Sequence, residues 1–211
     1  MCKFGSYLAK PSITAMFGFS ASGMMCPPML VYPYEWIPSE ITQGVPDDRK
    51  AGHNPTGWMT VEVFKKYIGN VFAVHLGKYK VKFPDIFFID WHRTPLTYQL
   101  SELFSQLVII LISLYPNTRR LLQPLEVATS RPLKLGWKTA VLDRRRQNSN
   151  RILNREWFAP FLDGAVQKYS LACSAVRGFR ACDLYSWNPK NTDFLECLGK
   201  KTKHRWTIQK H

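Results

Sequence analysis

The chain has 211 residues, with 29 Lys and Arg against 15 Asp and Glu, so its net charge is +14 and its pI is about 9.7. Hydrophobic residues make up 45% and aromatic residues 14% of the chain, which excludes disorder along its whole length. No apolar run approaches the ~18 residues that a membrane span needs. The excess of positive charge favours a polyanionic partner, most often a nucleic acid, and a merely basic surface is the alternative.

The cysteines and the N-terminal residues point away from secretion. Five cysteines are present, an odd number, and the sequence MCKFGSYLAK has no apolar segment of the kind found in secretory signals. We therefore expect free thiols in a reducing compartment. Cys197 and His204 lie near the basic C-terminus, but two ligands do not make a zinc site.

The first predicted element is a β-hairpin. Residues 12–20 favour a strand, Ala-Ser-Gly at 21–23 is a turn signal, and a second strand follows at 24–33. Pro27 and Pro28 indicate that this second strand is an edge strand or carries a bulge. The next segment, 35–57, is rich in Pro and Gly and is predicted to be a long loop.

A strand–helix–strand unit is predicted at 86–114. Residues 86–90 form a short apolar strand, Thr94 and Pro95 supply a helix cap and a first-turn proline, and 108–114 has the β-branched pattern of a buried strand. The apolar stripe of the connecting helix comprises Leu96, Leu100, Leu103 and Leu107. The two strands should therefore be parallel, with a right-handed crossover.

Three other helices are predicted. Thr60 is expected to cap one that ends at Gly77, another follows Pro132, and a further helix covers 156–169. Residues 144–151 are interpreted as a polar, basic connection. The apolar side of the helix after Pro132 comprises Leu133, Trp137, Val141 and Leu142.

Two carboxylates follow the predicted parallel strands. Asp90 ends the first strand, and Glu126 lies beyond the second. Because ligands gather at the carboxyl ends of parallel strands, the two side chains could converge and bind Mg²⁺ or Mn²⁺ for phosphoryl-transfer chemistry. The alternatives are structural: Asp90 as a turn residue before Thr94, and Glu126 as a first-turn acid of a helix that begins near Leu125.

These residues lie in motifs that resemble a known family. "GWMTVEVF", "FPDIFFIDWHRTPLTYQLSEL", "LISLYPNTRRLLQPLEVATSRPLKLGW" and "GFRACDLYSWNP" are similar to the DDE superfamily endonuclease domain, most of all to pogo/Tigger and jerky-like transposases. The resemblance runs from about residue 12 to residue 199. It implies a ribonuclease H-like fold, three acidic metal ligands and DNA cutting and joining. Asp90 matches the second acid and Glu126 the third, which is usually Asp in this branch.

The chain also departs from this pattern. The family's first acid belongs to a strand ahead of the hairpin, but no Asp or Glu precedes Glu35, so the strand is expected to be missing or replaced by MCKFGSYLAK. Trp91 follows the second acid where a small residue or Asn is usual, and Val108 stands where relatives often have a Gly that ends a helix. DNA-reading helix-turn-helix modules are absent from these residues. The pattern is typical of a truncated or decaying transposase copy.

A basic helix face gives the predicted nucleic-acid surface. Its basic residues recur at helical spacing along the helix predicted near Pro132, and they are Arg131, Lys134, Lys138 and Arg145. Such a face can run along a DNA backbone, although a solvated helix face is the alternative. Arg119, Arg120 and Arg144 to Arg146 could contribute. Trp58, Trp137, Trp157 and Trp187 are interpreted as core residues, not base-stacking platforms.

The predicted protein is an α/β domain with a ribonuclease H-like fold, a mixed sheet flanked by helices and no first strand. Residues 1–199 form the endonuclease-like domain and 200–211 a basic tail with a possible nuclear import signal, which predicts a nuclear location. The predicted function is non-specific DNA binding with weak or absent Mg²⁺-dependent catalysis by Asp90 and Glu126, and without a membrane or small-molecule partner. The alternatives are a protein-interaction scaffold, or an incomplete gene model of an active transposase.

Overall fold

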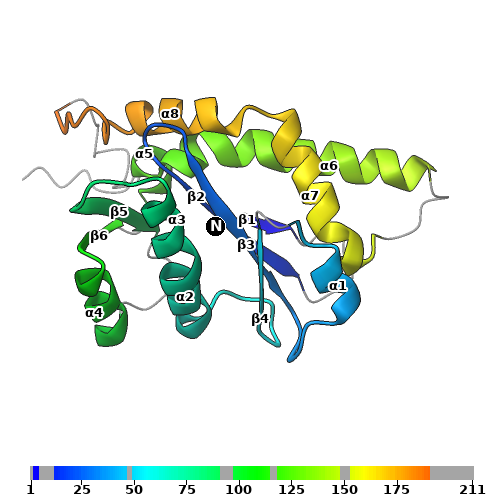
Figure 1. The fold of residues 1–211 in the computed structure, drawn as a ribbon. Helices are drawn as coiled ribbons and strands as arrows, with labels where there is room; N and C mark the ends of the chain where they lie inside the picture. The colour runs from blue at the N-terminus through cyan, green and yellow to red at the C-terminus, as the bar shows by residue number, and fades with distance from the viewer. Residues whose placement is uncertain are drawn as a thin grey trace, which may run out of the picture.

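The computed structural model describes residues 2–4, 12–46, 49–90, 97–114, 118–147 and 153–190, with the backbone alone for residues 2–4, 90, 119 and 120. The described chain has a mixed α/β arrangement, in which three strands come first, strands and helices mix from Ser39 to Leu114, and helices follow (Figure 1). The strands are β1 (Cys2–Phe4), β2 (Ile13–Phe19), β3 (Met25–Tyr32), β4 (Lys50–His53), β5 (Asp85–Asp90) and β6 (Ile109–Leu114). The α-helices are α1 (Ser39–Gln43), α2 (Val61–Tyr67), α3 (Ala73–Lys78), α4 (Tyr98–Gln106), α5 (Arg119–Leu122), α6 (Ser130–Gln147), α7 (Phe158–Lys168) and α8 (Leu171–Ala181).

The described strands belong to two sheets. One has the order β1-β2-β3-β4, and the other consists of β5 and β6. The predicted hairpin is confirmed, because β2 and β3 pair antiparallel. Their register shifts between Met16 and Gly18, opposite the strand that contains Pro27 and Pro28, so the prolines mark a bulge. On the other side of β3, β4 pairs with Met29–Tyr32, which follow the two prolines.

The segment 35–57 is not one long loop, as the sequence led us to expect. It contains the short helix α1 and the strand β4, which pairs parallel with Met29–Tyr32 of β3. At the other end of the sheet, β1 pairs antiparallel with Ile13–Ala15 of β2. This three-residue strand lies inside the N-terminal segment that was expected to lack or replace the first strand.

The helix predicted from Thr60 to Gly77 is confirmed with a π-helical interruption. The Thr60 hydroxyl accepts the amide of Val63, so it is the cap that the sequence predicts. The helix then runs through α2, a π-helical turn η1 (Ile68–Phe72) and α3. Its buried side chains face the second sheet and the underside of β3.

The β5–α4–β6 unit is confirmed as parallel, with Asp85 opposite Ile109 and Asp90 opposite Leu114. Two details differ from expectation. The cap of α4 is Thr97, whose hydroxyl accepts the amide of Leu100, whereas the predicted cap Thr94 lies outside the described residues.

The second difference is that β6 is not a buried strand. Ile110 is 51% and Ile112 37% exposed, because one face of this two-stranded sheet carries no full helical cover among the described residues. Val108, which joins α4 to β6, has a φ of 56° and is itself 55% exposed.

The C-terminal half is helical. The helix after Pro132 is confirmed as α6, and it continues to Gln147, so the basic residues at 144–146 are helical and not a connection. The helix predicted at 156–169 is confirmed as the 3₁₀ turn η3 (Arg155–Trp157) and α7. Helix α8 was not predicted from the sequence.

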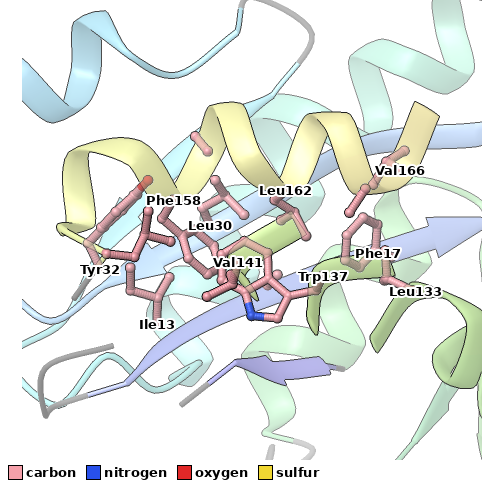
Figure 2. Close-up of a cluster of buried hydrophobic side chains, with 14 of the residues drawn as sticks. Ile13, Phe17, Leu30, Tyr32, Leu133, Trp137, Val141, Phe158, Leu162 and Val166 are labelled. Atoms are coloured by element: carbon pink, nitrogen blue, oxygen red, sulfur yellow. The ribbon is translucent and has the colours of Figure 1, made fainter. Parts of the chain in front are cut away.

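Two hydrophobic cores lie on opposite faces of the β2–β3 hairpin. Ile13, Ala15 and Phe17 point toward α6 and α7, where Trp137 and Phe158 pack with ring centroids 4.8 Å apart (Figure 2). The alternate side chains of β3 pack instead with α2, η1, α4 and β5. The hairpin is therefore sandwiched between two helical layers, as alternation along a strand requires.

Only part of the expected tryptophan core is present. Trp137 is 4% exposed, whereas Trp157 and Trp187 are 45% and 68% exposed and Trp58 is 37% exposed. No helix within the described residues is both long and apolar enough to span a membrane.

Candidate functional site

A cleft of about 790 Å³ lies between the two sheets. One wall is the second half of β2, from Met16 to Phe19, and the opposite wall is β5 from Asp85 to Ile89. The segment before α6, with Gln123 and Glu126, closes one end together with residues that follow α8. The lining is mainly apolar. The volume of the cleft falls in the range of ~300–1,000 Å³ that is typical of binding sites.

Glu126 lines this cleft and is half-buried. It lies in the first turn of a π-helical segment η2 (Leu125–Thr129), directly before α6, and its amide donates to the carbonyl of Gln123 at 3.0 Å. The expected first-turn position is therefore confirmed, and Glu126 also lines the cleft.

Helix α8 fixes the position of the Glu126 turn. Gly178 of α8 packs against the backbone of Pro124, and a Cβ at position 178 would lie 2.4 Å from the Pro124 carbonyl oxygen. Only a glycine allows this close approach. The ring of Phe179 in the same helix packs edge-on against that of Phe88 in β5, with ring centroids 6.5 Å apart. Helix α8 therefore also contacts the second sheet.

Asp90 is the last residue of β5, opposite Leu114 of β6. Its side chain lies outside the described part of the structure, as do Trp91 and His92. Ile89, its neighbour, and Leu114, its strand partner, both line the cleft that Glu126 faces. The convergence of the two carboxylates at one ion stays a prediction.

The described residues fit a divalent ion only incompletely. Glu126 and Asp85 are the acidic side chains that line the cleft, and Lys134 places a positive charge in the same lining. A metal site of this kind needs several oxygen ligands, and a nearby ammonium group opposes the binding of a cation. Within the residues that the structure describes, no three His, Cys, Asp or Glu side chains gather where they could hold a metal ion.

Two polar groups in this cleft were not predicted from the sequence. Gln123 is 7% exposed, lines the cleft, and its Oε1 has no hydrogen-bond partner among the described residues. Asp85 begins β5, and its carboxylate accepts the amide of Ile86 at 2.9 Å. Asp85 could have been found from its place at the start of a strand, whereas nothing in the sequence marks Gln123.

The predicted basic face is partly exposed, as DNA binding requires. Arg131, Lys134 and Lys138 are exposed along α6, and Arg145 is half-buried further along the same helix. Of these four residues, Lys134 also lines the cleft that Glu126 faces. We call the four residues the α6 stripe.

The neighbouring arginines are engaged differently. The Arg144 guanidinium lies over the rings of Trp157 at 4.6 Å and Phe161 at 5.0 Å, so it ties α6 to η3 and α7. Arg146 pairs with Asp143 at 3.4 Å on the surface. The side chains of Arg119 and Arg120, and the whole of 200–211, lie outside the described residues.

Buried titratable groups near the cleft favour their neutral forms. Burial, followed by the charge of Asp85, raises the pKa of the Cys26 thiol to about 12. Burial, followed by the charge of Lys78, lowers the pKa of His75, whose ring packs 4.7 Å from that of Tyr79. His75 is therefore a buried structural histidine.

Comparison with known proteins adds the family. Residues 10–180 match the family described as DDE superfamily endonuclease. A protein named "MFS-type transporter clz9" from Cochliobolus lunatus is 22% identical over 178 residues, which are 84% of this chain and 19% of that protein. The chain thus spans about a fifth of this curated relative. No solved structure matches the chain.

Proposed function

The chain belongs to the DDE superfamily endonuclease family, and from this premise we propose that it is a transposase-derived DNA-binding protein with weak or no strand-cleaving activity. Endonuclease domains of this family generally use divalent metal ions. The proposal includes the ribonuclease H-like fold, the pogo/Tigger or jerky-like ancestry and non-specific contact with DNA phosphates.

One observation carries the DNA-binding part: Lys134 of the α6 stripe lines the cleft that Glu126 faces. Lys134 belongs to both, so a duplex lying along Arg131, Lys134 and Lys138 would bring a phosphate to the mouth of the cleft. The net charge of +14 strengthens the attraction at long range. Lys and Arg contacts to phosphates release counterions, which gives affinity without sequence specificity.

The charge balance in the cleft supports weak catalysis. Glu126 and Asp90 are the acids that the family resemblance assigns. If a metal ion binds, Glu126 and Asp90 would hold it, and the ion would supply Lewis acidity at a phosphodiester. Lys134 in the same lining lowers the affinity of the cleft for a cation and raises it for a phosphate.

DNA binding is tested with a fluorescent 20-base-pair duplex and the full chain, by anisotropy at several salt concentrations. We expect a Kd that rises steeply with salt, since each phosphate contact adds ~0.9 to the slope of log K against log salt. The triple variant R131A/K134A/K138A should lower that slope by about 3. A matched control with the same charge loss is K50A/K66A/K82A, at exposed lysines away from α6.

The two triple variants separate local contact from net charge. Equal losses of affinity in both would assign binding to overall charge and contradict a role for the α6 stripe. No binding at micromolar protein and low salt would instead support the alternative, a protein-interaction scaffold that needs no DNA.

The catalytic part is tested by nicking of supercoiled plasmid with Mg²⁺ or Mn²⁺. We expect no nicking above that of the D90A and E126A variants. Robust nicking that disappears in both variants would overturn the proposal of weak activity and support an active transposase, the second alternative. Nuclear location is a separate part of the proposal, and imaging of a tagged chain with and without residues 200–211 tests it.

A further inference from the structure

Two large aromatic side chains that follow α8 are exposed beside the cleft. Tyr185 is 56% and Trp187 is 68% exposed, although the sequence favoured a core position for Trp187. Leu184 and Tyr185 of the same turn line the cleft. We call residues 184–187 the aromatic turn. Single exposed apolar side chains are common on protein surfaces, but two aromatic ones in one turn beside a cleft indicate a contact surface.

The backbone of the aromatic turn is held by the end of α8. The amides of Leu184 and Tyr185 donate to the carbonyl of Phe179, at 3.1 and 3.3 Å. Leu184 also forms an antiparallel bridge with Trp187, which closes the turn. Phe179 itself packs against Phe88 of β5. The two exposed rings are thus presented on a fixed backbone, and a preorganised surface loses less entropy when a partner binds.

The charges around the aromatic turn favour an anionic partner. Arg177 and Arg180 are exposed on α8, and Lys190 is exposed after the turn. Within the described stretch 171–190, Asp183 is the one acidic residue. This excess of cations attracts a polyanion and opposes contact with a basic surface, including that of a second copy of this chain, whose net charge is +14.

Exposed aromatic rings with cations nearby match the two parts of a nucleotide, its base and its phosphate. An aromatic side chain stacks on the open face of a base, and each base stacked in this way raises affinity by roughly five-fold or more. Inside a duplex both faces of a base are covered by its neighbours, whereas an unpaired base has a free face. The aromatic turn therefore fits single-stranded nucleic acid better than a duplex.

We propose that Tyr185 and Trp187 form a stacking platform for the unpaired bases of a single-stranded DNA segment that leads from the cleft over the aromatic turn. The exposed cations around the turn contact the phosphates of this segment. The inference rests on the proposed function for the duplex part of the substrate, which lies on the α6 stripe, because the stripe and the aromatic turn both contribute to the lining of the cleft. The preferred substrate is thus a duplex with a single-stranded tail.

The test measures the affinity of the full chain for four fluorescent DNAs by anisotropy at constant salt. They are a blunt 20-base-pair duplex, the same duplex with a tail of six thymidines, the same duplex with a tail of six abasic residues, and a single strand of 20 thymidines. The two tails carry the same phosphates, so they differ only in their bases. With the tail at the 3′ or at the 5′ end, the thymidine tail should bind at least five-fold more tightly than the abasic one.

Substitutions in the aromatic turn should remove this preference. Y185A/W187A should bind both tails equally and the blunt duplex as the parent chain does. The matched control is W36A/Y98A, which also removes one Trp and one Tyr, each 82% exposed and outside the lining of the cleft, and it should keep the preference. W187F should retain most of the preference because a phenyl ring still stacks, whereas W187L should lose at least half of it.

Three outcomes would overturn the inference: equal affinity of the parent chain for both tails, a preference that survives in Y185A/W187A, or equal effects of W187F and W187L. Failure of the proposed function has a different pattern. If the blunt duplex does not bind, but the single strand binds and Y185A/W187A weakens it at least five-fold, the α6 stripe is refuted and the platform stands. If no DNA binds, both are refuted. Thermal unfolding checks that each variant is folded.

Discussion

The backbone at Val108 offers a sharp test of how α4 ends. Val108 directly follows Leu107, the C-cap of α4, its φ is 56°, and its amide donates to the carbonyl of Ser105 at 3.0 Å, as expected for a residue that terminates a helix in the left-handed conformation. In this conformation a Cβ costs about 1–2 kcal/mol, so glycine is usual there. Val108 is 55% exposed, so its side chain gains little from burial in return.

The size of the stability difference follows from comparing alanine with glycine at position 108, because both substitutions remove nearly all of the valine side chain. At position 108 the glycine variant avoids the cost of the Cβ, about 1–2 kcal/mol, and loses ~0.4–1 kcal/mol of backbone entropy. V108G should therefore be more stable than V108A by about 0.5–1 kcal/mol. For a chain of this size, that difference raises Tm by roughly 2–4 °C per kcal/mol.

The control site is Val74, which is 65% exposed and lies within the helix α3. There V74G should be less stable than V74A by about 1 kcal/mol, because glycine is unfavourable inside a helix. The assay is thermal or urea denaturation followed by circular dichroism. A glycine variant less stable than the alanine variant at both sites would refute the left-handed assignment of Val108.

Two further predictions concern packing and pH. G178A should destabilise the fold by about 1–3 kcal/mol in urea denaturation, because its Cβ would lie 2.4 Å from the Pro124 carbonyl oxygen. The control G164A has open space around its Cβ in α7 and should stabilise the fold by up to ~1 kcal/mol. Equal effects of the two substitutions would contradict the close approach of α8 to Pro124. Iodoacetamide at pH 8 should label the exposed Cys173 and spare Cys26, whose pKa of about 12 leaves roughly one molecule in 10⁴ ionised, as mass spectrometry would detect. Since an unfolded thiol ionises near pH 9, the burial of Cys26 also makes stability fall as the pH rises from about 9 toward 12.

The sequence predicted those elements that local chemistry determines. The turn signals at 21–23 gave the β2–β3 hairpin, Thr60 gave the helix cap, and the spacing of apolar residues gave the parallel β5–α4–β6 unit. In each of these cases the pattern lies within one or two neighbouring elements, so no distant contact is needed to interpret it.

Features that depend on distant contacts were missed. Strand β4 is four residues long in a segment rich in Pro and Gly, and only its pairing with β3 makes it a strand. The β-branched run of β6 has the pattern of a buried strand, yet Ile110 is half exposed, because burial depends on what covers the sheet. For the site, Glu126 was placed in its helical turn from sequence, but Gln123 has no signal that local patterns could detect.

One hairpin forms a wall of both hydrophobic cores. Tyr32 packs on one face against Phe158 of α7, and its neighbour Val31 packs on the other face with the α2 layer. Loss of either helical layer would uncover apolar side chains of strands on which the opposite layer depends. The chain should thus unfold in a single cooperative transition, and destabilising substitutions at residues 13–32 should lower the stability of both hydrophobic cores.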